Sequence, residues 1–271
     1  MKIQQIRNAT IIIEYAGKRF LVDPMLGKKG SFAPFPFSHH QELRNPLHDL
    51  HIKAEEIVNN IDCVLLTHLH LDHIDNTAYE LLNKKIHIFV QDEQDRKTVM
   101  NHGFTNVEII GEESRFGDIR LTKTESHHGH WWMLPLAGHT CGYVLRHETE
   151  PVCYLAGDTI WYSGVRRNID RWHPQVIIVN AGGNKFYIGG HVIMHISDVM
   201  KSMDYAPWAT FVATHLEGVN HNQVSRAAIR EEVLKCGKKD RIHIPEDGEI
   251  IELYFHDGQI ASKSLKNKNR T

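Results

Sequence analysis

Residues 65–76 read LLTHLHLDHIDN and place three histidines and two aspartates directly after an apolar run. Histidine nitrogens and carboxylate oxygens are common metal ligands in proteins. On an extended chain, His68 and His70 stand two positions apart and point to the same side. The chain then turns towards a predicted helix, and Asp72 and His73 in that turn can face a second point nearby. One loop can therefore supply ligands to two metal ions.

Ligand-type residues also follow three other apolar strands. Asp158 comes after VCYLA, His215 after TFVA, and the pair His127 and His128 after IRLTKT. In α/β proteins, sites form in the crevice outside the carboxyl ends of the strands. If these four strand ends lie side by side, the ligands converge. The two oxygens of Asp158 can then bridge two metals, and His215 completes the set of the second metal.

The order of predicted elements favours two packed sheets. The β-rich runs 10–15 and 19–24 flank the turn AGK, which is typical of a hairpin. Helices are predicted over 53–60, 76–84 and 92–103, each beside a strand, while strands dominate the middle of the chain. Strand and helix alternate in the second half. This order predicts an α/β fold, a four-layer αββα sandwich of two mixed β-sheets with helices on the outer faces.

One long segment, residues 27–51, holds three prolines and shows no periodicity. Long loops in compact domains are often lids or binding loops. Phe32, Phe35 and Phe37 of this segment either form a hydrophobic lid or cover the core.

The motif H-x-H-x-D-H after an apolar strand resembles that of the metallo-β-lactamase-fold hydrolases, and THLHLDHID (67–75) matches it without a mismatch. The similarity extends through LAGDT and ATHLEGVNH. RNATIIIEYAGKRFLVDP, AGDTIWY and VNAGG are most similar to the branch that holds ascorbate-phosphate lactonases and N-acyl-phosphatidylethanolamine phospholipase D. This resemblance implies the αββα sandwich and a dinuclear metal site.

The resemblance also implies a third histidine for the first metal, from a loop before the bridging aspartate. TESHHGH (124–130) and AGHTCG (137–142) both offer one. The second segment resembles the G-H-T-x-G of the glyoxalase II branch, whereas the first follows a strand directly and its H-G resembles the lactonase-like branch. We favour His128, and His139 and His127 stay open as alternatives.

These residues predict a metal-dependent hydrolase. The predicted metal ligands are His68, His70, Asp72, His73, His128, Asp158 and His215, of which Asp72 and Asp158 are also the predicted catalytic residues. Two divalent ions per chain, Zn or Mn with Fe as a third option, would bridge a hydroxide that cleaves an ester-like bond of a small molecule, a lactone or a phosphoester.

Two other functions compete with this one. A phosphodiesterase or nuclease would need clustered Lys and Arg to grip phosphates, and the sequence lacks such a patch. A metal-binding sensor without turnover would have no need of a full set of hydroxide-generating ligands.

A few residues outside the ligand set have two interpretations. His191, His195 and Trp131 are candidate substrate contacts, and a structural role is the alternative for each. For His221 we favour the structural role, and we expect Asp23 in LVDP to order a turn rather than contact the site.

Composition and length bear on the partners, the compartment and the domain organisation of the chain. The 271 residues carry a net charge of −2, which gives no general attraction to nucleic acid or membrane surfaces. No apolar run approaches the length of a membrane span, and no secretory signal is apparent. Four scattered cysteines without a C-x-x-C pair suit reduced thiols in the cytoplasm. We expect one domain over 1–271, with 262–271 as a flexible basic tail, and the oligomeric state is left open.

Overall fold

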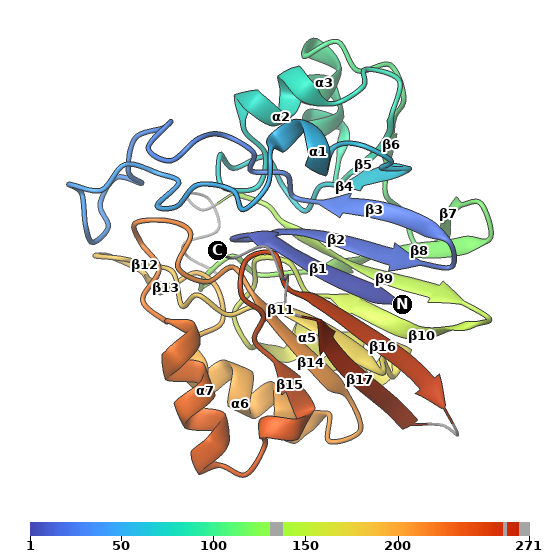
Figure 1. The fold of residues 1–271 in the computed structure, drawn as a ribbon, viewed down its shortest axis with the longest axis vertical. Coiled ribbons are helices and arrows are strands. Elements are labelled where there is room, and N and C mark those ends of the chain that lie inside the picture. The colour runs from blue at the N-terminus through green and yellow to red at the C-terminus, as the bar shows by residue number, and fades with distance from the viewer. Residues whose placement is uncertain (131–137, 257–258, 266–271) are drawn as a thin grey trace.

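The computed structural model describes residues 1–130, 138–256 and 259–265. They form two mixed β-sheets that lie face to face, with helices outside each sheet (Figure 1). The predicted αββα sandwich is therefore confirmed. None of the helices in these ranges has the length and apolarity that a membrane crossing requires.

The first sheet has eight strands in the order β17-β16-β1-β2-β3-β4-β5-β6. In chain order its strands are β1 (Lys2–Arg7), β2 (Thr10–Tyr15), β3 (Lys18–Val22), β4 (Cys63–Leu65), β5 (His87–Val90), β6 (Val107–Ile109), β16 (Ile250–His256) and β17 (Gln259–Leu265). Strands β3 to β6 are parallel, and the remaining neighbours are antiparallel. The loop that follows β4 therefore starts at the same edge of the sheet at which β3, β5 and β6 end.

The second sheet has seven strands in the order β15-β14-β11-β10-β9-β8-β7. They are β7 (Ser114–Phe116), β8 (Ile119–Glu125), β9 (Cys141–His147), β10 (Glu150–Leu155), β11 (Val176–Asn180), β14 (Thr210–Thr214) and β15 (Ile242–His243). Strands β10, β11 and β14 are parallel, and both β8 and β10 run antiparallel to β9. Hence β8, β10, β11 and β14 all end at one edge of the sheet.

Helices cover the outer face of each sheet. Over the first sheet lie α1 (Ala54–Ile57), α2 (Asn76–Leu81) and α3 (Glu93–Asn101), and over the second lie α5 (Ser163–Trp172), α6 (Ile196–Tyr205) and α7 (Arg226–Lys235). A short hairpin, β12 (Lys185–Phe186) and β13 (Gly190–His191), stands apart from both sheets (Figure 1).

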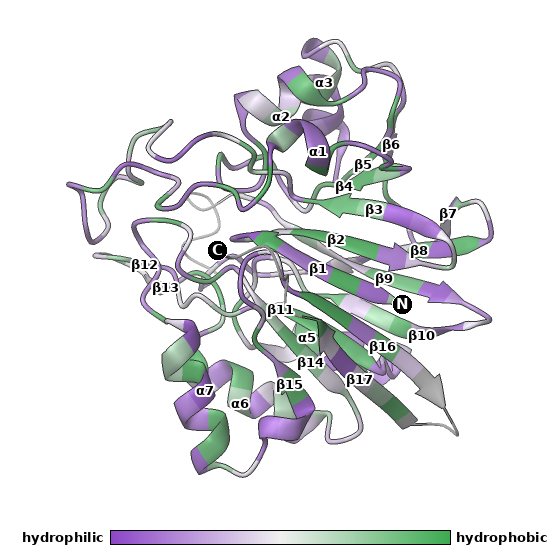
Figure 2. Cartoon of the chain, in the orientation of Figure 1, coloured by the Kyte–Doolittle hydropathy of each residue, from purple (hydrophilic) through white to green (hydrophobic). Residues whose placement is uncertain are grey.

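The buried layers follow from the two-residue period of the strands. In β2, Ile11 and Ile13 belong to the apolar layer between the sheets, whereas Ile12 packs with the helices of the first outer layer. Figure 2 shows hydrophobic residues along much of the strands, and both hydrophobic and hydrophilic residues on the helices. Three apolar layers result, and they hold the two sheets in a fixed relation.

Some elements differ from the sequence-based expectation. Residues 262–265 belong to β17, which pairs with β16, so the predicted flexible tail is wrong over these four residues. Helix α5 was not predicted because its sequence is mostly polar and only its Gly164, Val165 and Ile169 are buried. The β12–β13 hairpin is too short to give a periodic signal.

Candidate metal centre

The four predicted strand ends meet between the two sheets. The loop after β4 carries His68, His70, Asp72 and His73, and the second sheet presents His128 after β8, Asp158 after β10 and His215 after β14. All of these side chains are buried except His70, which is half-buried. The structure therefore brings all seven predicted ligands together.

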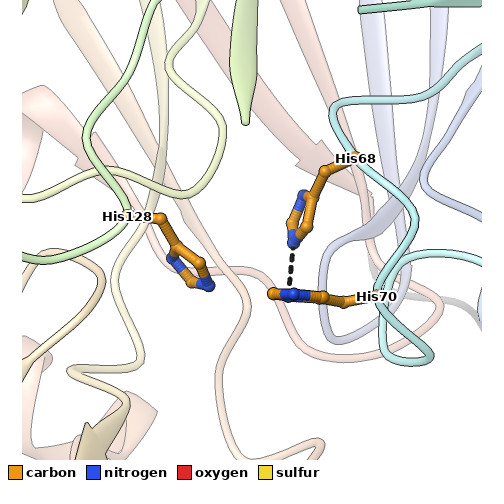
Figure 3. A group of neighbouring side chains, drawn as sticks. All are labelled: His68, His70 and His128. Atoms are coloured by element: carbon orange, nitrogen blue, oxygen red, sulfur yellow. Dashed lines mark hydrogen bonds between the residues drawn. The ribbon is translucent and has the colours of Figure 1, made fainter. Parts of the chain in front are cut away.

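The first group contains His68, His70 and His128, whose ligand atoms lie within 4.8 Å of one another. Figure 3 shows the three rings converging, with Nε2 of His68 at 2.9 Å from Nδ1 of His70. Nδ1 of His128 donates to the carbonyl of Val192 at 3.0 Å. This bond places the ring proton on Nδ1 and leaves the Nε2 lone pair free to bind a metal.

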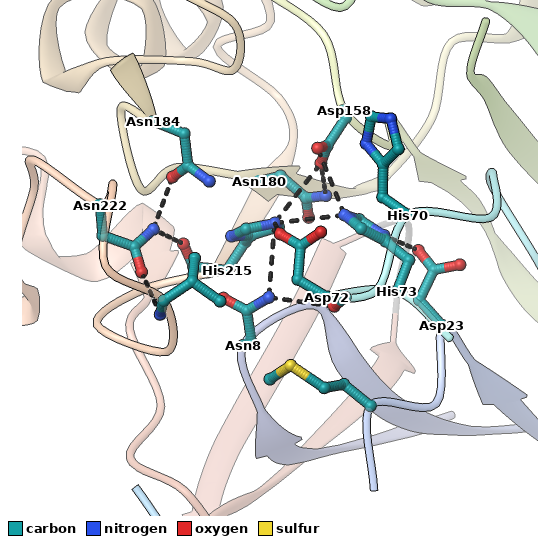
Figure 4. Close-up of polar contacts among 12 residues, drawn as sticks. Asn8, Asp23, His70, Asp72, His73, Asp158, Asn180, Asn184, His215 and Asn222 are labelled. Atoms are coloured by element: carbon teal, nitrogen blue, oxygen red, sulfur yellow. Dashed lines mark hydrogen bonds and ion pairs between the residues drawn. The ribbon is translucent and has the colours of Figure 1, made fainter. Parts of the chain in front are cut away.

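The second group contains Asp72, His73 and His215, again within 4.8 Å. Nε2 of His215 lies 3.2 Å from Nε2 of His73 and 3.3 Å from Oδ2 of Asp72 (Figure 4). Two ring nitrogens and a carboxylate thus face one point.

Asp158 lies between the two groups. Its Oδ2 is 3.2 Å from Nε2 of His73 and 3.9 Å from Nε2 of His68, while its Oδ1 is 3.8 Å from Nε2 of His215. The side-chain amide of Asn180, the last residue of β11, donates to Oδ1 at 2.5 Å. The carboxylate is therefore held within reach of both groups, with Oδ2 near His73 and His68 and Oδ1 towards His215.

Asp23 supports the centre from the end of β3. Its Oδ2 accepts from the Thr67 hydroxyl at 2.7 Å and from Nδ1 of His73 at 2.8 Å. Because the Thr67 hydroxyl gives its proton to Asp23, its oxygen accepts from Nδ1 of His68 at 3.0 Å. Both histidines then carry the proton on Nδ1 and present Nε2 to the centre. The expectation that Asp23 only orders a turn is wrong, since its carboxylate orients two of the predicted ligands.

Local backbone features position the loops. Gly157 has a φ of +68°, and a Cβ there would overlap the carbonyl oxygen of Cys141, so only glycine fits directly before Asp158. Asp75 caps α2 by accepting from the amide of Ala78 at 2.9 Å, which ends the ligand loop at a defined point. His215 itself adopts a left-handed φ of 60°.

Asn8 connects two of the ligand loops. Its side-chain amide donates to the carbonyl of Asp72 at 3.1 Å, and its own carbonyl accepts from the backbone amide of His215 at 2.9 Å. Asn8 and Asn180 were missed by the sequence reasoning. Asn180 ends the strand VIIVN in the same way as the ligands end theirs, and this position was the available signal.

The electrostatics of the centre favour bound positive charge. Burial and the neighbouring histidines lower the pKa of His68, and burial with His128 lowers the pKa of His70 to about 4. Although burial opposes ionisation, His73 and His215 hold the pKa of Asp158 well below its usual value. Neutral imidazoles and ionised carboxylates are the forms that bind divalent cations. The nitrogen and oxygen donor set, without thiolate, therefore fits the predicted ions.

The alternative histidines lie outside these groups. His127 stacks on Tyr162 with ring centroids 3.9 Å apart, and His139 lines a pocket of about 560 Å³. Among the residues that the structure describes, neither contributes to a group of convergent ligand atoms.

The structure describes two of the three candidate substrate contacts, His191 and His195. Nδ1 of His191 donates to the carbonyl of Gly183 at 2.8 Å, and its ring lies 4.7 Å from that of His195. Both are half-buried, and His195 precedes the first residue of α6. Trp131 lies outside the described residues.

Comparisons with known proteins show the family of the chain. Residues 18–216 match the model of the beta-lactamase superfamily domain. The UPF0173 protein YddR of Bacillus subtilis (strain 168) is 43% identical over 92% of this chain and 98% of its own length. A UPF0173 metal-dependent hydrolase of Koribacter versatilis is 29% identical over 48% of this chain and 58% of its own length.

Two crystal structures extend the match to the whole fold. An isothiocyanate hydrolase from Delia radicum gut bacteria is 37% identical with a TM-score of 0.89, over 92% of this chain and 98% of the other. A possible metal-dependent hydrolase from Veillonella parvula is 34% identical with a TM-score of 0.90 over the same shares, 92% and 98%. The nearer resemblance to ascorbate-phosphate lactonases and N-acyl-phosphatidylethanolamine phospholipase D stays a prediction. The chain belongs to the β-lactamase superfamily and, within it, to the UPF0173 metal-dependent hydrolases.

Proposed function

We propose that this chain is a dinuclear hydrolase that cleaves a small electrophilic molecule with water activated between two divalent metal ions. One observation carries the proposal. Asp158 lies between the two groups of donor atoms: its Oδ2 is 3.2 Å from Nε2 of His73 and 3.9 Å from Nε2 of His68, and its Oδ1 is 3.8 Å from Nε2 of His215. A carboxylate in that position is suited to bridging two ions.

Each residue has a defined task in this proposal. His68, His70 and His128 would hold one ion, Asp72, His73 and His215 the other, and Asp158 both. When bound, the two ions would acidify a water molecule and polarise the bond to be cleaved. Zn, Mn and Fe all suit these ligands.

The chain supplies the rigid frame for this chemistry. Asp23 keeps the proton of His73 on Nδ1, and the Val192 carbonyl does the same for His128, so both rings direct Nε2 at the centre. Asn180 fixes the rotation of Asp158. Such preorganisation removes much of the ordering cost from the reaction itself.

Two substrate classes are supported. The resemblance of RNATIIIEYAGKRFLVDP, AGDTIWY and VNAGG to the branch that holds lactonases favours an ester-like bond, in a lactone or a phosphoester. The similarity to an isothiocyanate hydrolase favours an isothiocyanate, whose central carbon is also attacked by water. All of these are small molecules.

The test is turnover of δ-valerolactone, bis(nitrophenyl) phosphate and benzyl isothiocyanate by the purified protein. We expect hydrolysis of at least one, its loss after chelation, and its return when Zn or Mn is restored. His215→Ala should abolish it, whereas His243→Gln, in β15, should leave it intact. Turnover that is unaffected by His215→Ala, or a metal-loaded protein inert towards all three compounds, would contradict the proposed function.

A further inference from the structure

His221 lies beside the metal centre but belongs to neither ligand group. It follows β14 by a few residues and is only 4% exposed. The charges of Asp72 and Asp158, and the rings of His215 and His128, all act on it. Asn184 and Asn222 link its ring to the loop of His215, because the Asn222 Nδ2 that donates to Asn184 also donates to the carbonyl of His215 at 3.2 Å.

A chain of amide contacts fixes the proton of His221 on one ring nitrogen. The backbone amide of Val219 donates to Oδ1 of Asn222 at 2.9 Å, so the Asn222 Nδ2 is a donor, and it donates to Oδ1 of Asn184 at 2.5 Å. The remaining Asn184 group, Nδ2, therefore donates to Nε2 of His221 at 3.0 Å (Figure 4 shows the two asparagines). Because Nε2 accepts, the proton of the neutral ring is on Nδ1.

The other side of the ring has an unused donor. Burial lowers the pKa of His221 to about 3, so the ring is neutral at physiological pH. Nδ1 is buried and has no hydrogen-bond partner among the described residues. A buried N–H group without an acceptor costs free energy, and a purely structural histidine would be expected to use both nitrogens.

Aromatic rings form the walls around His221. The ring of Phe35, from the long loop 27–51, lies 4.5 Å from it, and the ring of Phe186, in β12, lies 5.4 Å from it. Nδ1 is closed to solvent in this structure, so a ligand reaches it only after a neighbouring group moves, and these two rings are aromatic neighbours of the imidazole. An uncharged ligand suits such a slot, because burying an ion there would be expensive.

We propose that His221 binds the substrate, donating the Nδ1 proton to an uncharged nitrogen, oxygen or sulfur acceptor that enters between Phe35 and Phe186. This rests on the proposed function, and it narrows the substrate class to uncharged molecules such as a lactone or an isothiocyanate. In this proposal the Asn222 and Asn184 amides keep the proton of His221 on Nδ1, from which it is donated to the substrate.

Three substitutions separate this role from a structural one. His221→Gln keeps an acceptor for Asn184 but places no N–H at the Nδ1 position. His221→Asn does the reverse, since its amide N–H falls near Nδ1 and its contact with Asn184 is lost. His221→Phe removes both contacts, and His243→Gln controls for loss of an imidazole outside the centre. Metal content and melting temperature are measured for every variant.

The substrate role predicts that the KM for the hydrolysed probe rises about five- to tenfold in the Gln and Phe variants, as for one lost hydrogen bond. The Asn variant should stay within about twofold of wild type, with kcat and metal content little changed in all. A structural role predicts the opposite ranking, with Gln nearest to wild type, and that ranking would overturn the proposal.

A second measurement does not depend on turnover. Nitrogen-15 NMR of the metal-loaded wild type should show His221 protonated on Nδ1 and bare on Nε2, and the reverse assignment would also overturn the proposal. If none of the three probes is hydrolysed, the proposed function fails, and dissociation constants for the same probes take the place of KM in ranking the variants. The absence of the predicted ranking for every probe would then refute the role of His221 alone.

Discussion

Oδ2 of Asp23 lies 2.8 Å from Nδ1 of His73, although 50 residues separate the two in sequence. The contact joins the end of β3 to the ligand loop after β4 and settles which nitrogen of His73 faces the metal centre. A carboxylate behind a ligand histidine also raises the basicity of that ligand.

Asp23→Asn should therefore weaken metal binding without unfolding the chain. We expect about 10- to 100-fold lower affinity, as for other outer partners of metal ligands. Competition with a chromophoric chelator measures this, and Asp118→Asn, an exposed carboxylate before β8, is the control. Equal affinities for the two variants would show that Asp23 has no such role.

The metal content follows from the number of donor groups. Two groups that share Asp158 lead us to expect about two divalent ions per chain in protein purified without chelator. Elemental analysis by mass spectrometry measures the ratio. A fully active preparation with no more than one ion would exclude the dinuclear assignment.

Part of this centre was predictable from local sequence. His68, His70, Asp158 and His215 each follow a short apolar run, and short runs of this kind are consistent with buried strands. The strand order then brings their ends to one place. The partner of His73 was not predictable in this way, because Asp23 reaches it through the parallel pairing of β3 with β4, where Val22 is opposite Leu65.

Local sequence also could not decide between His127 and His128 as the third histidine. The residues are adjacent and leave the strand in different directions, and the carbonyl that orients His128 belongs to Val192, 64 residues away. In the fold, β17 was missed because pairing with β16, and not the polar composition of the segment, makes it a strand.

The third histidine can be tested directly. His128→Ala should lower both metal content and activity strongly, since it opens a coordination position, whereas His139→Ala should leave the metal content near wild type. Both variants are compared by elemental analysis and turnover on one preparation. The reverse ranking would move the site to AGHTCG.

A substitution at Gly157 tests whether the backbone directly before Asp158 requires glycine. Gly157→Ala combines a left-handed φ with overlap on Cys141 and should lower the free energy of unfolding by about 3 kcal/mol or more. Gly117→Ala, with a φ of +59° and open space around it, isolates the conformational cost at about 1 to 2 kcal/mol. Urea unfolding of the metal-free proteins measures both, and equal losses would show that the close approach to Cys141 is unimportant.

A substitution at Asp158 tests the proposed activation of water between two ions. Asp158→Asn keeps the shape of the side chain, and its Oδ1 can still accept from Asn180, but the charge between the two groups is lost. Two cations held by the two groups would then repel each other with less compensation, so one ion should be lost or held weakly. The activated water would lie nearer to a single ion and be less acidic.

Activity of Asp158→Asn should therefore fall by about 10² or more, and the pH optimum should rise, since a less acidified water ionises at higher pH. The fold should survive, because one carboxylate at a strand end contributes little to the apolar layers. The measurement is a pH–rate profile with metal content and melting temperature from the same preparation. A folded Asp158→Asn protein that holds two metals and turns over at the wild-type rate would show that Asp158 is not the bridge, and water activation between two ions would have to be abandoned.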